Sequence, residues 1–185
     1  SKNTDCMCVQ ETRGSHTMVN KHLRGISELF WIKGSFLGGN AGGVITCISK
    51  KSVMLEHQNS FSEIVKGRVT RTHIASSKGW QTIWNVHNFG LSSREVDYFV
   101  SVAFEDIQLA KLDPYNRSVF MVGDFNFACP SRQVFQYSYP ISPNEGASLD
   151  TSIRPSHHAA PGRILELCNA MVEIVQPCPT HYIHE

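Results

Sequence analysis

The sequence predicts an α/β domain from its alternation of strand and helix patterns, and its composition and length indicate a single globular domain. Short runs rich in β-branched and aromatic residues alternate with one or two stretches in which apolar residues recur at helical spacing. The composition is that of an ordinary globular protein, with 41% hydrophobic and 18% charged residues. At 185 residues the chain can bury a core without disulfides or a structural metal. We therefore expect a single domain over residues 1–185.

The predicted strands are short and are separated by turn-forming residues. Gly67 lies within one long β-rich run, and a glycine in that position marks a bend between two strands. The run 118–122 is apolar at successive positions, which is typical of a strand in the middle of its sheet. We expect strands at residues 5–9, 27–33, 44–49, two within 62–75, 81–86, 118–122 and 172–175.

One long helix is predicted after these first strands. Ser92 with Glu95 three residues later forms a capping box, which sets the start of the helix. Asp113 followed by proline ends it. A second helix is expected at residues 163–171. Residues 127–160, rich in proline and serine, are expected to form a long surface excursion.

Charge and cysteine content exclude several classes of protein. A net charge of +1 creates no general field for nucleic acid or an anionic membrane, so any contact with a polyanion must be local. No apolar run is long enough to span a bilayer, and no signal peptide is visible. Six cysteines without a CxxC pair argue against a structural zinc site. They fit a reducing compartment, so we expect an intracellular protein of the cytoplasm or nucleus.

Polar side chains follow three of the predicted strands at the point where each apolar run stops. Glu11 follows the first, His87 and Asn88 follow the strand at 81–86, and Asp124 and Asn126 follow the strand at 118–122. Ligands tend to bind at strand ends in α/β sheets. Side chains alternate along a strand, so Asp124 and Asn126 are expected on the same side.

These residue types suit hydrolysis of a phosphodiester. A carboxylate such as Glu11 is a ligand that Mg²⁺ prefers, with Mn²⁺ as the alternative metal. Asp124 can orient or deprotonate the attacking water. Asn126 offers an amide donor to a phosphoryl oxygen, and His87, if charged, would stabilise the transition state.

Each residue also has an ordinary structural explanation. Glu11 would then be a solvated carboxylate, His87 a hydrogen-bonded strand-end residue, and Asp124 with Asn126 turn formers. The occurrence of all three sets in this order favours the functional interpretation.

Four motifs resemble those of the endonuclease/exonuclease/phosphatase superfamily: "QET" (10–12), "GGVITCISK" (42–50), "NVHNFG" (85–90) and "VGDFNF" (122–127). The resemblance implies a four-layer α/β sandwich, in which two mixed β-sheets pack face to face with helices outside. It also implies magnesium-dependent cleavage of phosphate esters.

The resemblance also implies roles for single residues, matched by motif position. Glu11 corresponds to a metal-binding glutamate, Asp124 to the aspartate that orients water, and Asn126 to the asparagine that holds the phosphate. His87 stands where members place a residue that contacts the phosphate, and Asn88 is a further candidate for substrate contact.

The sequence departs from the family pattern at both ends. Members have an asparagine-bearing strand before "QET", and after the "VGDFN" motif an aspartate-bearing strand and a Ser-Asp-His motif. None of these is found here. We therefore expect a domain incomplete at both termini, whose 185 residues alone are inactive although the parent protein is an active hydrolase.

Within the superfamily, the strand "GRVTR" and the ending "QPCPTHY" most resemble the endonuclease domains of non-LTR retrotransposons. That resemblance implies a DNA-nicking enzyme followed by a reverse transcriptase in the same polyprotein. Arg68 and Arg71, with Lys66 and His73, could form a stripe that contacts the DNA phosphates, or they could simply lie on a solvated strand face. The alternatives are a phosphatase or sphingomyelinase of the same superfamily, and a non-catalytic relic or interaction module.

Overall fold

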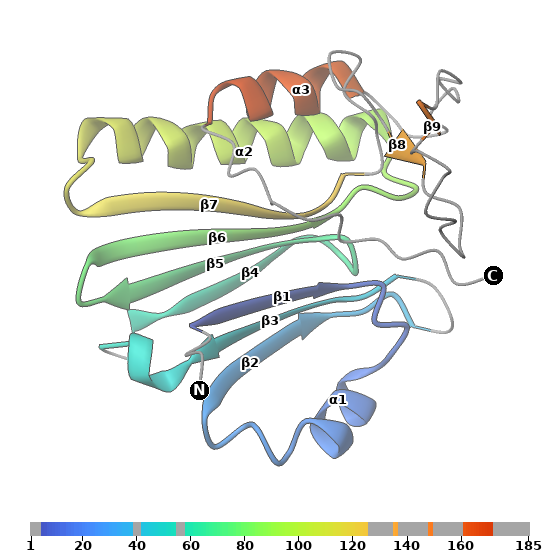
Figure 1. Ribbon diagram of the computed structural model, residues 1–185, viewed down its shortest axis with the longest axis vertical. Coiled ribbons are helices and arrows are strands. Elements are labelled where there is room, and N and C mark those ends of the chain that lie inside the picture. The colour runs from blue at the N-terminus through green and yellow to red at the C-terminus, as the bar shows by residue number, and fades with distance from the viewer. Residues whose placement is uncertain are drawn as a thin grey trace.

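The computed structural model describes residues 5–38, 42–54, 58–125, 135–136, 148–149 and 161–171. Within them, two β-sheets pack face to face, with one helix outside the first sheet and two outside the second (Figure 1). The predicted α/β sandwich is confirmed. The predicted strand at 172–175 and most of the excursion at 127–160 lie outside the described residues.

The first sheet has three antiparallel strands in the order β1-β3-β2. Its central strand, which coincides with the strand predicted at 44–49, is buried along its whole length. A seven-residue helix between the first two strands covers the outer face (Figure 1). These elements are β1 (Cys6–Gln10), α1 (His16–His22), β2 (Phe30–Ser35) and β3 (Val44–Ser49), followed by a short 3₁₀ turn at Lys50–Ser52.

The second sheet has four strands in the order β4-β5-β6-β7. The first three strands are antiparallel, whereas β7 runs parallel to β6, so the sheet is mixed. A parallel neighbour requires a crossover connection, and α2 provides it. The elements are β4 (Ser60–Val65), β5 (Val69–Ser76), β6 (Gly79–His87), α2 (Ser93–Leu112) and β7 (Arg117–Asp124).

Three shorter elements follow β7. Two two-residue strands pair with each other, and a helix packs beside α2 (Figure 1). They are β8 (Phe135–Gln136), β9 (Ser148–Leu149) and α3 (Pro161–Asn169), the helix predicted at 163–171.

The largest core cluster lies between the four-stranded sheet and its helices. Trp84 and Phe99 are fully buried there, together with Ile164 and Leu167 of α3. Burial of each of these side chains stabilises the fold by about 1.5–3 kcal/mol. The predicted capping box is present at Ser92, which is why α2 begins where the sequence placed it.

A polar group joins the two sheets close to one end of the sandwich. Asn85 of β6 is fully buried. Its amide donates to the Ile45 carbonyl at 2.9 Å and its Oδ1 accepts from Gln10 Nε2 at 2.7 Å. Because a buried amide is costly unless it is paired, this bridge fixes how β6 faces β1 and β3.

The prediction that the strand at 118–122 is central was wrong for the described residues. There, β7 is one of the two edge strands of its sheet. Val119 and Met121 pack against the α2 core, whereas Phe120 and Val122 lie on the face toward the other sheet and are 41% and 44% exposed. The strand is apolar on both faces because it stands between two layers, although nothing described pairs with its outer edge.

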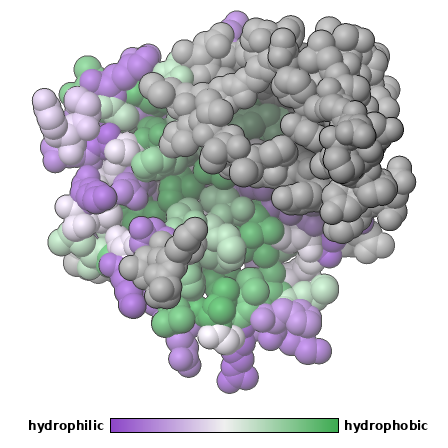
Figure 2. Space-filling model, in the orientation of Figure 1, coloured by the Kyte–Doolittle hydropathy of each residue, from purple (hydrophilic) through white to green (hydrophobic). Residues whose placement is uncertain are grey.

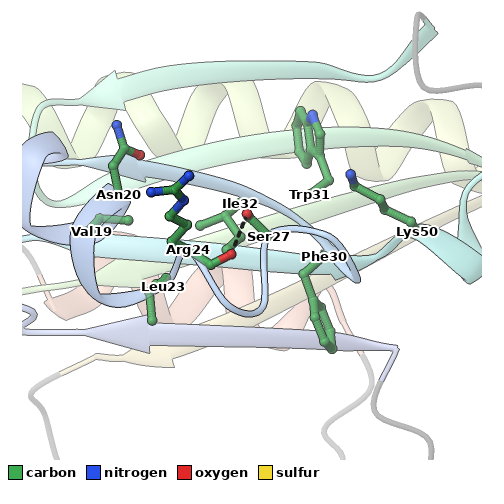
Figure 3. A pocket seen from close by; sticks show the side chains of 9 residues that line it. All are labelled: Val19, Asn20, Leu23, Arg24, Ser27, Phe30, Trp31, Ile32 and Lys50. Carbon is green, nitrogen blue, oxygen red and sulfur yellow. Dashed lines mark hydrogen bonds between the residues drawn. The ribbon is translucent and has the colours of Figure 1, made fainter.

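The outer face of the three-stranded sheet carries a further apolar area. Figure 2 shows hydrophobic residues gathered over β1, β2 and α1. Met7, Val9 and Met18 are among the exposed apolar side chains there. An open groove lies between α1, the turns that follow it and β2 (Figure 3). No helix in the described part of the chain combines the length and apolarity needed to cross a bilayer.

Candidate active site

Strand ends from both sheets meet at one end of the sandwich. Glu11 follows β1 of the first sheet, whereas His87 ends β6 of the second. Glu11 Oε1 lies 3.3 Å from His87 Nε2. His87 is also paired in register with Asp124, the last residue of β7. The structure therefore brings these three predicted site residues together, while Asn126 lies outside the described residues.

The backbone around Glu11 has an uncommon conformation. Glu11 and Arg13 have positive φ angles of 54° and 42°, a region that residues other than glycine rarely adopt. Two backbone hydrogen bonds hold this turn, from Thr12 N to Gly43 O at 3.1 Å and from Arg13 N to Gly42 O at 2.9 Å. Such local strain costs about 1–3 kcal/mol per residue and is concentrated at functional sites. Here it accompanies the turn that carries the predicted metal ligand.

His87 is almost fully buried, at 1% exposure. Its Nδ1 lies 2.9 Å from Arg68 Nη1. Its Nε2 has no hydrogen-bond partner among the described residues, since Glu11 lies at 3.3 Å without hydrogen-bond geometry. Burial lowers the pKa of His87, and the charge of Arg68 lowers it further, although Glu11 and Asp124 oppose these effects. The structure thus favours a neutral imidazole over the charged form considered from the sequence.

Asn88 fixes the ends of β6 and β7 relative to each other. Its backbone N–H donates to the Asp124 carbonyl at 2.8 Å, and its side-chain amide donates to the Phe125 carbonyl at 2.7 Å. Its buried Oδ1 has no hydrogen-bond partner within the described part of the chain. The Nδ2 group of Asn88 is therefore hydrogen-bonded within the protein, whereas its Oδ1 can still accept a hydrogen bond from a ligand.

The two predicted phosphate-contacting arginines lie in different places. Arg68 is 9% exposed and lies beside His87, within 5.4 Å of the Phe89 ring centroid. Arg71 lies on the opposite face of the sheet, over Trp84, with Nη1 3.7 Å from Asp106 Oδ1. Only Arg68 is therefore part of the candidate site.

A magnesium ion at these strand ends, as predicted from the sequence, would be held by Glu11. Within the described ranges there is no cluster of three or more His, Cys, Asp or Glu side chains that could hold a metal. Glu11, however, is 53% exposed and close to His87, whose Nε2 is a buried polar atom without a hydrogen-bond partner. Mg²⁺ usually keeps several waters and binds proteins through one or two carboxylates together with substrate phosphates. Glu11 is an accessible carboxylate of this kind, and magnesium binding by it stays a prediction.

The groove on the far side of the first sheet is separate from this site. None of Glu11, His87 and Asp124 lines it (Figure 3). The ring of Phe30 and the side chains of Asn20 and Lys50 line it instead, and Ser27 Oγ donates to the Arg24 carbonyl across its floor.

Sequence reasoning missed two features of the site. One is the contact of Arg68 with His87, for which the only local signal was an arginine directly after the Gly67 turn. The other is the pair Gly42 and Gly43, whose carbonyl oxygens accept the backbone hydrogen bonds of the turn that follows Glu11. A Cβ on Gly43 would lie 2.4 Å from Thr12 Oγ1, so glycine is needed there.

Comparisons with known proteins find likeness only among solved structures. No family model matches the chain, and no curated protein does. The AP endonuclease LMAP from Leishmania major is 18% identical, with a TM-score of 0.46, covering 67% of this chain and 46% of its own. ANGEL2, a 2′,3′-cyclic phosphatase, is 14% identical, with a TM-score of 0.47 and coverage of 69% and 40%. A humanized D. rerio TDP2 is 12% identical, with a TM-score of 0.43 and coverage of 67% and 50%. This chain spans half or less of the length of each.

Proposed function

We propose that this chain carries part of the active site of a metal-dependent phosphodiester hydrolase, and that the parent protein nicks DNA. The observation that carries the proposal is the approach of Glu11 to His87, 3.3 Å apart, where strand ends of the two sheets meet beside Asp124. A carboxylate next to an imidazole nitrogen without a hydrogen-bond partner suits an anionic ligand and its counter-ion.

Each residue has a distinct role in the proposed reaction. Glu11 would hold Mg²⁺, or Mn²⁺, with water and substrate oxygens completing its shell. When bound, the metal offsets negative charge on the phosphate and its leaving oxygen. Asp124 orients the attacking water, His87 donates its Nε2 proton in a hydrogen bond to a phosphoryl oxygen, and Asn126 is predicted to hold the phosphate.

DNA as the substrate rests on the motif resemblance described above. We infer on the same ground that the parent is a non-LTR retrotransposon endonuclease with a reverse transcriptase in the same polyprotein. Asn88 is the additional candidate for substrate contact, since its Oδ1 has no hydrogen-bond partner among the described residues. Arg68 supplies positive charge behind His87.

The test is nicking of supercoiled plasmid with Mg²⁺ and with EDTA. Three proteins are compared: the 185-residue chain, a longer form extended at both ends, and the longer form with Asp124→Ala. We expect only the longer unsubstituted protein to nick, and only with metal. Loss of a general base or water-orienting group typically costs about 10²–10⁴ in rate, so the Asp124→Ala form should be nearly inactive.

Two other outcomes would assign the protein to another class. Turnover of a soluble phosphate ester or of sphingomyelin without plasmid nicking would identify a phosphatase or sphingomyelinase. Calorimetry that detects no difference in Mg²⁺ binding between the unsubstituted protein and its Glu11→Gln form, with no turnover of any substrate, would indicate a non-catalytic module.

A further inference from the structure

We propose that Arg68 is a positioning residue that holds His87 as the neutral tautomer with its proton on Nε2. The consequence for catalysis rests on the proposed function, whereas the tautomer itself is a property of the folded chain. The tautomer decides whether the nitrogen that faces Glu11 donates or accepts a hydrogen bond. It therefore determines what His87 can do to a bound phosphate.

The chemistry of the guanidinium group gives the direction of this hydrogen bond. Arginine has only N–H donors and no acceptor. With Arg68 Nη1 2.9 Å from His87 Nδ1, the Nδ1 atom must accept through its lone pair. A neutral imidazole then carries its proton on the other nitrogen, Nε2. The opposite tautomer would place two N–H groups against each other.

Arg68 is attached to His87 at a second point. The His87 backbone N–H donates to the Arg68 carbonyl at 2.8 Å, and the Arg68 backbone N–H donates to the Val65 carbonyl at 3.0 Å. Main chain and side chain of one arginine therefore both bond the same histidine. This double attachment fixes the ring as well as the strand end.

The guanidinium also lies in a space shaped for it. A Cβ on Gly42 would lie 2.9 Å from Arg68 Nη1, so a larger residue there would displace the side chain. Phe89 stacks on the His87 ring, with centroids 5.9 Å apart, and its own face lies 5.4 Å from the guanidinium carbon. Gly42 therefore lies close against the guanidinium, and Phe89 contacts both the guanidinium and the His87 ring. Burying an arginine to 9% exposure is costly, and a role in positioning explains why it is kept there.

The result is a fixed hydrogen-bond donor at the strand ends. His87 Nε2 is buried and has no hydrogen-bond partner in the described ranges, with Glu11 3.3 Å away. Its N–H lies beside Glu11, the residue that would hold a cation in the proposed function. Hydrogen-bond partners that set the tautomer of a metal-ligating histidine typically affect activity by about 10–100-fold, and we expect an effect on the same scale for His87.

The first experiment reads the tautomer without any need for activity. The 185-residue chain is labelled with ¹⁵N-histidine, and His87 is assigned by its loss in a His87→Gln form. We expect Nδ1 to resonate as an unprotonated ring nitrogen and Nε2 as a protonated one. In Arg68→Met, which removes every donor, we expect a mixture of tautomers, whereas Arg68→Lys, which retains a donor, should keep the original one.

Two variants keep the comparison informative. Arg68→Leu, which likewise carries no donor, replaces Arg68→Met if the latter fails to fold. Lys78→Met is the matched control, because it removes an exposed cation from the turn at the other end of β5 and β6. A protonated Nδ1 in the unsubstituted chain, or a spectrum unchanged by loss of the arginine, overturns the proposal.

The second experiment measures nicking by the longer protein. We expect Arg68→Met to lower kcat by about 10–100-fold with little change in KM, and Lys78→Met to leave both unchanged. A change in KM alone would mean that Arg68 binds substrate and does not position His87. If the tautomer is as expected but no form nicks DNA, the positioning role stands and the proposed function fails.

Discussion

Gly123 of β7 lies directly against the backbone of Val86 in β6. A Cβ built on Gly123 would be 1.9 Å from the Val86 carbonyl oxygen and 2.9 Å from its nitrogen. The neighbouring atoms are backbone atoms, so they cannot move aside as a side chain would. The residues that follow these two, His87 and Asp124, are the ones that reach the candidate site.

Gly123→Ala is therefore expected to destabilise the protein. Forcing an extra carbon into a packed interior typically costs about 1–3 kcal/mol, and this contact leaves no slack. Urea unfolding of the Gly123→Ala protein and of the unsubstituted protein measures the difference in stability. Gly25→Ala is the control, because a Cβ on Gly25 meets nothing within 4 Å. Equal urea midpoints for Gly123→Ala and Gly25→Ala would show that β7 does not lie this close to β6.

Asp106 is expected to be important for stability although it lies far from the site. Its carboxylate accepts from Trp84 Nε1 at 3.0 Å and lies 3.7 Å from Arg71 Nη1, and it is only 7% exposed. Asp106→Ala leaves a buried indole N–H unpaired, which costs about 1–3 kcal/mol. Thermal unfolding measures this loss.

The same helix offers a matched control for Asp106. Asp97 pairs with Arg163 at 3.2 Å, but both side chains are exposed. Exposed ion pairs contribute only about 0–1 kcal/mol, so Asp97→Ala should change the melting temperature much less. Equal losses in the two variants would argue against the buried bond to Trp84.

Stability is expected to fall as the pH drops below the usual pKa of histidine. Burial lowers the pKa of His73, and the charge of Arg71 lowers it further. Below about pH 6.5 the unfolded chain binds a proton that the folded chain does not, so unfolding is favoured increasingly down to the folded pKa. Above about pH 6.5 neither the folded nor the unfolded chain binds this proton, so His73 no longer makes stability depend on pH.

Urea midpoints measured between pH 7.5 and pH 5 test this dependence on His73. His73→Gln should reduce the decline, because its neutral amide does not titrate, and the lowered pKa of His87 accounts for a part that stays. His22→Gln, at the exposed end of α1, controls for the loss of a histidine as such. A slope that His73→Gln leaves unchanged would contradict the assignment to His73.

The three cysteines with described side chains are expected to react very differently with thiol reagents. Cys47 is fully buried, and burial raises the pKa of its thiol. Cys6 is exposed, and Cys8 is half-buried with its sulfur 4.0 Å from that of Cys6. The bond from Cys6 lowers the pKa of the Cys8 thiol, so Cys8 should provide the thiolate of this pair.

Mass spectrometry after brief alkylation reads each cysteine separately. The hydrogen bond to Cys8 raises the pKa of the Cys6 thiol, so we expect rapid label on Cys8 at neutral pH, slower label on Cys6, and label on Cys47 only after denaturation. Rapid labelling of Cys47 in the folded protein would show that β3 is not buried as described.

Local signals in the sequence predicted most elements. The run 44–49 coincides with β3, and Ser92 with Glu95 placed the start of α2 where it is observed. Gly67 has a φ of 64° and separates β4 from β5, as expected for a mid-run glycine. These features depend on neighbouring residues, and so they can be recognised without the fold. In contrast, α1 was not predicted, because seven residues with no buried side chain show no helical pattern.

The sequence by itself determined the α/β class, the long capped helix and the residue types at the strand ends. Only the tertiary structure decided that β7 is the outer described strand, that Arg68 faces His87 while Arg71 faces Asp106, and that Glu11 meets His87. Arg68 and His87 are 19 residues apart in the chain. Periodicity tells which residues share a face of one strand, but pairing between strands is set by contacts between distant residues. The site is made of such contacts, and for that reason its geometry was not visible in the sequence.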